Sequence, residues 1–277
     1  MKKYVLVDSN NGRLGNQLFP LMVGITYLNR HINKYEIPMY FKDEGWRLCE
    51  EFRNSVDLDK LNEIVNLNVD DFQRKYLEQK DVLRRVNTPQ QLLKAIEYTF
   101  PTILFYGYLQ EASLIDEVIC QKFLKANEFT KQKILNQFGD DIKNSICLHV
   151  RRGDFLTEYN KSRYLTITKE WIDLVIEKYY PNKRIICISD DLTWCKQTLT
   201  NENYEIVFPQ GLNTSEEFWI QTLTGGNICS ASTFSIAGAL LNPNLNAVAP
   251  IPFFNLEEWE NSIGKLIIPD WMKREPI

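Results

Sequence analysis

The chain has 277 residues, of which 44% are hydrophobic and 25% charged, and its formal net charge is −4. This composition is ordinary for a soluble globular protein, and the length allows one large or two medium-sized α/β domains. The acidic balance argues against a nucleic-acid-binding protein, because such proteins carry a concentrated basic face.

The cysteines and the N-terminus restrict the location of the protein. Six cysteines are spread along the chain without a CxxC pair, and several lie in apolar runs such as SICLHV and RIICIS. We interpret them as reduced, buried side chains rather than disulfide partners or zinc ligands. The apolar run in MKKYVLVD is too short for a signal peptide, and no segment approaches the length of a membrane-spanning helix. We therefore expect a cytoplasmic protein, with at most peripheral contact with the inner membrane face.

The first half opens with a strand, a loop and a helix. KKYVLVD (2–8) is typical of a buried strand, GRLGNQ of a glycine-bearing loop, and apolar residues at helical spacing follow from Leu18 to Leu28. Further strands are predicted at 35–41 and 102–109, and a helix over EASLIDEVICQKFL (111–124). Residues 42–100 are charged with weak periodicity, so we expect only helices and loops there.

The second half alternates regularly after a polar stretch at 127–145. Continuously apolar runs predict strands in SICLHV, RIICIS, YEIVF, NICS and NAVAP, and helices are predicted between them. Such strands, separated by helices, imply βαβ units and parallel sheets covered on both faces. We predict an α/β protein of two Rossmann-like lobes facing a central cleft. The first spans 1–135, with a helical and loop insertion at 42–100, and the second spans 136–277.

Three polar loops follow strands of the second half. HVRRGD, ISDD and SASTFS each lie where a parallel sheet places its ligands, at the carboxyl ends of strands. Arginines and a helix N-terminus with hydroxyl groups suit a phosphate, and a strand-end aspartate can accept hydrogen bonds from a guanine edge or a ribose. The loops together predict a site for a nucleoside diphosphate.

Each motif also has a purely structural explanation. Arg151 and Arg152 can form a salt-bridge network with Asp154, SASTFS can be a helix cap, and GRLGNQ can be a tight turn. The occurrence of three such loops in one alternating chain favours the binding site.

These motifs resemble the α-1,2-fucosyltransferases of glycosyltransferase family 11. The resemblance rests on GRLGNQLF, HVRRGDF, ISDDLTWC and ASTFSIAGALL, in family order from about residue 10 to 254, and GYLQEASLI is similar to another family segment. It implies a GT-B fold and inverting, metal-independent and cofactor-free transfer of L-fucose from GDP-fucose to the 2-hydroxyl of a terminal β-galactoside. It also implies an oligosaccharide or lipid-linked glycan acceptor in O-antigen or surface polysaccharide synthesis, and no nucleic acid partner.

The resemblance also assigns roles to individual residues. Arg151 would hold the β-phosphate and stabilise the departing GDP, because preorganised donors stabilise charge that develops in the transition state. Asp154 is the second catalytic candidate, and Asp8 and Glu111 are the other candidates for the general base. Arg152 would belong to the same site and brace its loop. The other predicted binding residues are Gly12, Asn16 and Gln17 in the first lobe, His149 and Asp190 near the guanosine, and Ser232, Thr233, Phe234 and Ser235 around the pyrophosphate.

The chain departs from the family pattern near its end, and this leaves alternatives open. Ala231, Ile236 and Ala237 replace an amide and two bulky aromatic residues, and EEFWIQTL replaces a more aliphatic helix. Another GDP-deoxysugar, such as GDP-colitose, and an inactive GDP-binding relative are therefore alternatives.

Two other classes of protein have short matches. Asp57 and Asp59 form a DxD pair, as in metal-dependent GT-A transferases, and residues 152–154 spell the RGD of adhesion modules. Matches of this length arise by chance and favour neither class.

Overall fold

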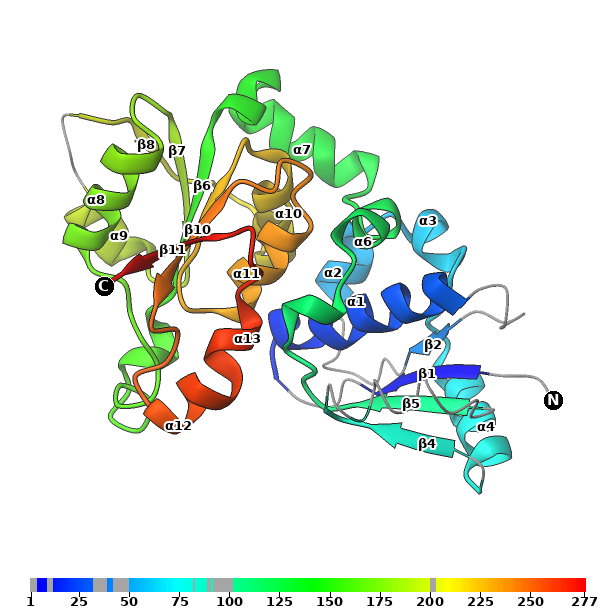
Figure 1. Ribbon diagram of the computed structural model, residues 1–277. Coiled ribbons are helices and arrows are strands. Elements are labelled where there is room, and N and C mark those ends of the chain that lie inside the picture. Colours follow the sequence, from blue (N-terminus) through cyan, green and yellow to red (C-terminus); the bar gives the residue numbers. More distant parts are fainter. Residues whose placement is uncertain are drawn as a thin grey trace. The chain divides into compact units, whose positions relative to one another are not determined.

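The computed structural model describes residues 4–8, 12–31, 39–41, 50–81, 83–88, 91, 102–199 and 203–277. The chain divides into two compact units, Met1–Asn127 and Glu128–Ile277, each containing its own parallel sheet (Figure 1). The border lies before the predicted one at 135/136 and keeps the helix α7 (Glu128–Phe138) whole. This helix packs on α10 (Thr214–Leu223) of the second unit, where Lys133 Nζ lies 2.7 Å from Glu216 Oε2.

The first unit is a five-stranded parallel sheet in the order β3-β2-β1-β5-β4. Tyr27 of α1 packs edge-on against Phe105 on one face, and Phe72 of α4 joins Leu6 and Leu104 on the other. The strands are β1 (Tyr4–Asp8), β2 (Met39–Phe41), β3 (Val65–Asn66), β4 (Leu83–Val86) and β5 (Thr102–Tyr106). The helices are α1 (Leu14–His31), α2 (Glu50–Ser55), α3 (Leu58–Asn62), α4 (Val69–Gln79), η2 (Ala112–Leu114) and α6 (Glu117–Phe123).

Two predictions for this unit were wrong. Residues 42–100 were expected to hold only helices and loops, but β3 and β4 lie there. The single helix expected over 111–124 is interrupted, because the carboxylate of Asp116 accepts the N–H of Ile119 and starts α6 as a new helix.

The DxD pair has a structural explanation, since Asp57 caps α3 by accepting the N–H of Lys60.

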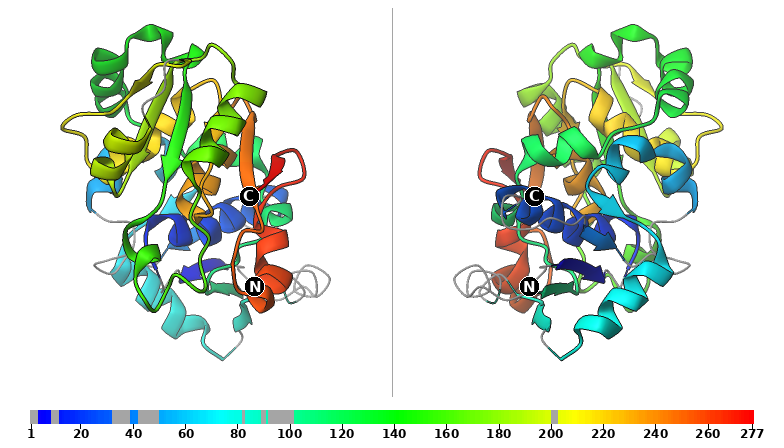
Figure 2. Two further views of the ribbon diagram at one scale, coloured as in Figure 1. Left: turned by 90° about the vertical axis from the view of Figure 1, so that its left-hand side faces the viewer. Right: turned by 90° about the vertical axis from the view of Figure 1, so that its right-hand side faces the viewer.

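The second unit is a six-stranded parallel sheet in the order β11-β10-β9-β6-β7-β8. Helices α8 and α9 cover one face and α10 and α11 the other (Figures 1 and 2). The strands are β6 (Ile146–Val150), β7 (Ile185–Ser189), β8 (Ile206–Val207), β9 (Asn227–Ile228), β10 (Ala247–Ile251) and β11 (Lys273–Pro276). The remaining helices are η3 (Asp140–Asn144), η4 (Gly153–Leu156), α8 (Lys169–Tyr179), α9 (Leu192–Thr198), α11 (Thr233–Leu240), α12 (Glu257–Trp259), η5 (Glu260–Gly264) and α13 (Lys265–Ile267).

The core of the second unit forms because alternate residues of β6 point to opposite faces. Leu148 and Val150 pack with Trp171 and Ile172 of α8, while His149 points to the face of α11. Thr168 caps α8 by accepting the N–H of Trp171.

Two further findings concern the cysteines and the helices. The described cysteines Cys120, Cys147, Cys187, Cys195 and Cys229 are buried and free, as predicted, and Cys49 lies outside the described residues. No helix in the described ranges combines the length and the apolar character needed to cross a bilayer.

Candidate functional site

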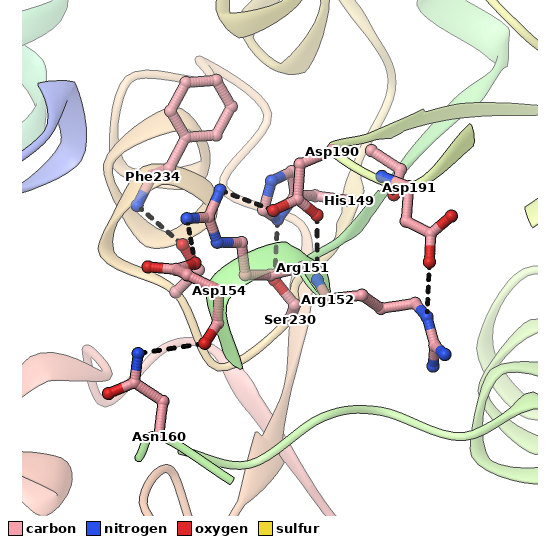
Figure 3. Close-up of polar contacts among 11 residues, drawn as sticks. His149, Arg151, Arg152, Asp154, Asn160, Asp190, Asp191, Ser230 and Phe234 are labelled. Carbon is pink, nitrogen blue, oxygen red and sulfur yellow. Dashed lines mark hydrogen bonds and ion pairs between the residues drawn. The ribbon is translucent and has the colours of Figure 1, made fainter. Parts of the chain in front are cut away.

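Three loops of the second unit come together because their strands are neighbours. Strand β6 lies between β9 and β7, so the loops that follow these three strands share the carboxyl edge of the sheet. Figure 3 shows the result, a group of side chains from all three loops. Arg151 contacts Asp190 of the loop after β7, and His149 separately contacts Ser230 of the loop after β9. The structure thus brings together the residues predicted in HVRRGD, ISDD and SASTFS.

His149 is a buried, neutral imidazole at the base of this group. Its Nδ1 lies 2.7 Å from Ser230 Oγ, and its ring centroid lies 5.1 Å from that of Phe234. Burial lowers the pKa of His149 to about 4, and the nearby Asp190 opposes this only in part. At neutral pH the ring therefore offers a hydrogen-bonding nitrogen and an aromatic face, but no charge.

Arg151 is fixed between two carboxylates. One guanidinium nitrogen pairs with Asp154, and the other lies 2.8 Å from Asp190 Oδ2. The guanidinium also lies above the ring of Phe155, 5.5 Å from its centroid, and the side chain is only 15% exposed. The predicted structural network therefore exists, and it orients the cation at the strand end where an anion is expected.

The carboxylate of Asp190 contacts both the backbone and a side chain of the loop that carries Arg151 and Arg152. Its Oδ1 accepts the N–H of Arg152 at 2.9 Å, while its Oδ2 pairs with Arg151. A Cβ at Gly153 would lie 2.3 Å from Asp190 Oδ2, so only glycine fits beside this carboxylate. The carboxylate that was predicted near a guanosine thus lies against the RRG turn.

Arg152 points away from Arg151 and braces the loop. Its Nε lies 3.1 Å from Asp191 Oδ2, and its guanidinium stacks 4.0 Å above the ring of Trp194. Asp191 in turn caps α9 by accepting the N–H of Trp194. Asp154 adds a second brace, because its carbonyl oxygen accepts hydrogen bonds from the side chains of Thr157 and Asn160. Both charged residues of the RGD sequence are therefore engaged inside the second unit.

The SASTFS loop begins α11, and its hydroxyl groups hold the loop in shape. Ser232 caps the helix by accepting the N–H of Phe234, and Ser235 Oγ donates to the carbonyl of Ser230 at 3.0 Å. Thr233 is half-buried, and the ring of Phe234 lies 5.3 Å from that of Phe218. The first turn of α11 carries no acidic residue, so no carboxylate of this turn opposes an anion at the positive end of the helix dipole.

The predicted residues of the first unit form a separate group at the start of α1. Gly12 has a φ of 90°, and a Cβ there would lie 2.2 Å from Asn16 Nδ2. Gln17 Nε2 donates to the carbonyl of Gly12 at 2.8 Å, and Asn16 Oδ1 accepts from Gln110 Nε2 at 2.9 Å. Among the other base candidates, Asp8 ends β1, and Glu111 follows Gln110 and accepts a hydrogen bond from Ser113.

Glu217 of α10 is a candidate that the sequence analysis missed. Its side chain is half-buried, and burial raises its pKa to about 7. Its neighbour Glu216 is accounted for by the capping box with Asn213 and the ion pair with Lys133. Carboxyls perturbed by burial are concentrated at functional sites. The signal in the sequence is a second acidic residue directly before the apolar FWI of EEFWIQTL.

A comparison with known protein families supports a transferase. The model of Glycosyl transferase family 11 matches residues 9–272, which is nearly the whole chain. The match includes the arginine loop and the start of α11 in the second unit, as well as the start of α1 in the first.

Two curated relatives come from Escherichia coli. An α-1,2-colitosyltransferase is 30% identical over 124 residues, which cover 42% of this chain and 43% of that protein. The O-antigen biosynthesis glycosyltransferase WbnK is 28% identical over 192 residues, which cover 60% of this chain and 59% of that protein. The matched segments thus span less than two thirds of either relative.

Among solved structures, the chain is similar to the NodZ α-1,6-fucosyltransferase crystal soaked with GDP-fucose. The TM-score is 0.53 at 13% identity, over 88% of this chain and 94% of that one. At this identity the likeness concerns the fold, and it confirms the predicted GT-B type of two Rossmann-like lobes. Because the family model matches residues 9–272, the chain belongs to Glycosyl transferase family 11.

Proposed function

We propose that the protein is an inverting α-1,2-fucosyltransferase that moves L-fucose from GDP-fucose to the 2-hydroxyl of a terminal β-galactoside. The observation that carries this proposal is the orientation of Arg151 by Asp154 and Asp190, at the strand edge where α11 also begins. This is the arrangement of donors that a nucleoside diphosphate requires. The family membership supports the reaction class.

The proposed donor is a sugar attached to a nucleoside diphosphate. In the transfer, the bond between the sugar C1 and the β-phosphate oxygen breaks, and its electron pair leaves with GDP. Arg151 and the N-terminus of α11 can stabilise this developing negative charge, because they are fixed before the reaction. We propose that they do so without a metal or another cofactor. The similar NodZ structure is that of an α-1,6-fucosyltransferase crystal soaked with GDP-fucose, which supports GDP-fucose as the donor here.

The acceptor oxygen attacks C1 from the opposite face and loses its proton. Asp154, Asp8 and Glu111 are the carboxylates proposed to take that proton. The ion pair between Asp154 and Arg151 favours a positioning role for Asp154. Asp8 and Glu111 belong to the first unit, which we propose holds the acceptor.

A second candidate donor is GDP-colitose, because one relative is named an α-1,2-colitosyltransferase. The departures at Ala231, Ile236 and Ala237 do not decide between the two sugars. All three side chains are at most 2% exposed and pack inside the second unit. Ala231 lies just before α11, and Ile236 and Ala237 lie within it, so these side chains affect packing inside the unit and the choice of sugar has to be measured.

The biological setting is proposed from the relatives. WbnK is named an O-antigen biosynthesis glycosyltransferase, which supports an oligosaccharide as the acceptor here, and we propose that it ends in a galactoside. We propose that the protein acts on such a glycan, free or lipid-linked, at the cytoplasmic face of the membrane.

A transfer assay with both donors tests the proposal. Purified protein is incubated with lactose in EDTA and either GDP-fucose or GDP-colitose, and GDP release and the mass of the product are read together. We expect a fucosylated lactose whose new linkage is α-1,2 by NMR. Product from GDP-colitose alone would show that colitose, not fucose, is the transferred sugar. Tight GDP binding without GDP release from either donor would point to another GDP-sugar, a stricter acceptor than lactose, or an inactive relative.

A further inference from the structure

Two tyrosines at the end of β5 are exposed to solvent. Tyr106 is 41% exposed and Tyr108 is 44% exposed, although both follow the fully buried strand residues 102–105. Leaving two large aromatic rings in water forgoes the burial that stabilises a folded protein. Paired exposure of this kind, at one end of a central strand, is typical of a surface that binds something.

The backbone has a positive φ at one residue between these tyrosines and at one residue after them. Gly107 has a φ of 90°, and Leu109 has a φ of 43°, which a branched side chain rarely adopts. Leu109 is nevertheless only 4% exposed, so the chain turns sharply to bury Leu109 and leave Tyr108 outside. Strain that is held in place by packing marks ligand-binding segments more often than neutral loops.

The position of the tyrosines in the sheet is that of a binding site. The strand order runs β3-β2-β1 on one side and β5-β4 on the other, so it reverses between β1 and β5. Open parallel sheets bind ligands at the carboxyl ends of the strands at such a reversal. Tyr106 is paired in register with Asp8, the last residue of β1, and therefore lies at this point.

The same edge of the sheet carries two side-chain amides, one at the start of α1 and one in the segment after β5. Gln110 Nε2 donates to Asn16 Oδ1 at 2.9 Å, which joins the segment after β5 to the start of α1. Gly12 is needed for the close approach of Asn16, as its Cβ would meet that side chain. An amide offers both donors and an acceptor, which suits the hydroxyl groups of a sugar.

From these observations we propose that Tyr106 and Tyr108 form a stacking platform for the acceptor galactose, with the amides of Asn16 and Gln110 directed to its hydroxyl groups. The class of ligand rests on the proposed function. A β-galactopyranose has one apolar face, formed by the C–H groups at C3, C4 and C5, and such groups pack against the electron-rich face of an aromatic ring. Glucose interrupts this face with its equatorial 4-hydroxyl, so the platform selects galactosides.

The test uses binding as well as turnover. Saturation-transfer NMR is recorded on the full chain with methyl β-galactoside and with methyl β-glucoside, in the presence of GDP. The proteins are the wild type, Tyr106→Ala, Tyr108→Ala, Tyr108→Phe, and Phe129→Ala as the control. Phe129 lies on α7 of the second unit and is 77% exposed, so its removal deletes an exposed ring away from the platform.

We expect the alanine variants to lose the galactoside signal and to raise the KM for lactose at least about fivefold, while the Kd for GDP stays unchanged. Tyr108→Phe and Phe129→Ala keep the signal, and the wild type shows none with the glucoside. An undiminished galactoside signal in both alanine variants would overturn the platform. Transfer to lactose with an unchanged KM in both alanine variants would also overturn the platform, although the proposed function would still hold. If no GDP-sugar is transferred but the galactoside signal depends on the tyrosines, the proposed function fails and the platform stands.

Discussion

At the scale of single residues, Arg151 already has two anionic partners and still has donors to offer. A guanidinium has five N–H groups, and the contacts with Asp154 and Asp190 engage its two terminal nitrogens. The remaining N–H groups can bind a phosphate without displacing the carboxylates. The carboxylates therefore act on the reaction through the direction in which they hold the guanidinium, and Asp190 also fixes the backbone of the loop.

Replacing Asp190 by asparagine tests this positioning. The variant keeps an oxygen for the N–H of Arg152 but loses the charge that orients Arg151. We expect kcat to fall at least about tenfold with little loss of thermal stability, because an electrostatic contact aimed at the transition state is lost. Gly153→Ala should behave similarly, since its Cβ displaces the same carboxylate. Steady-state kinetics measure both effects.

Glu158→Gln is the matched control, because it removes a carboxylate that is 88% exposed and pairs only with a surface lysine. If the Asp190→Asn enzyme has the same kcat as this control, Asp190 does not position Arg151 for the reaction.

His149 gives a stability prediction with a definite sign. Its pKa falls from 6.5 to about 4 on folding, because burial disfavours the charged ring. The unfolded chain therefore binds the proton more readily than the folded chain. The contribution of neutral His149 to the free energy of unfolding is complete above pH 6.5 and is lost as the pH falls towards 4. The loss amounts to at most about 3 kcal/mol.

His149→Gln should therefore flatten the dependence of the unfolding free energy on pH between 6.5 and 4. Urea denaturation of both proteins at several pH values measures it. Parallel curves for the variant and the wild type would contradict a buried neutral imidazole.

At the scale of helices and strands, continuous apolar runs predicted the buried strands well. SICLHV and RIICIS are β6 and β7, which lie in the middle of the sheet with both faces covered. The strands that were missed lie at sheet edges, and two of them carry charge: β4 is LRRV with exposed arginines, and β11 is KREP. Pairing with a neighbouring strand makes these segments extended, and their own sequence pattern does not reveal it.

The contacts of the site were harder to predict than its location. The strand ends and the arginine loop were recognisable, but the pairing of Arg151 with Asp190 depends on β6 and β7 being neighbours. The pairing of Asn16 with Gln110 likewise depends on β1 lying beside β5. The roles proposed for these residues toward substrate remain predictions.

Asn242 ties the elements around α11 together and should be essential for stability. Its side chain is fully buried, and its Nδ2 donates to the carbonyls of Gln221 and Thr224 and to Asn227 Oδ1. Asn242→Ala leaves a cavity and deprives the buried Asn227 oxygen of this donor. We expect a loss of about 2–4 kcal/mol in the free energy of unfolding, measured by denaturant titration.

Asn244→Ala is the comparison, because Asn244 also donates to the carbonyl of Thr224 but is exposed. Equal losses in the two variants would show that the network around Asn242 is not a special support for α11.

At the scale of the whole molecule, the net charge of −4 does not show how the charged and polar groups are distributed between the two units. The second unit collects two arginines and the N-terminus of α11 at the carboxyl edge of its sheet. The first unit presents tyrosines and amides at the carboxyl edge of its own sheet. This division of chemistry between the two sheets is the basis for proposing a charged donor in the second unit and a neutral sugar acceptor in the first.

The most direct test of the account is calorimetric titration of the wild type and Arg151→Ala with GDP and with GMP. We expect Arg151→Ala to weaken GDP binding at least about tenfold, because a charged hydrogen bond to the β-phosphate is lost. The affinity for GMP, which has no β-phosphate, should change by no more than about twofold. Equal affinity of the wild type and the variant for GDP, or an equal loss for GDP and GMP, would show that Arg151 does not hold the β-phosphate.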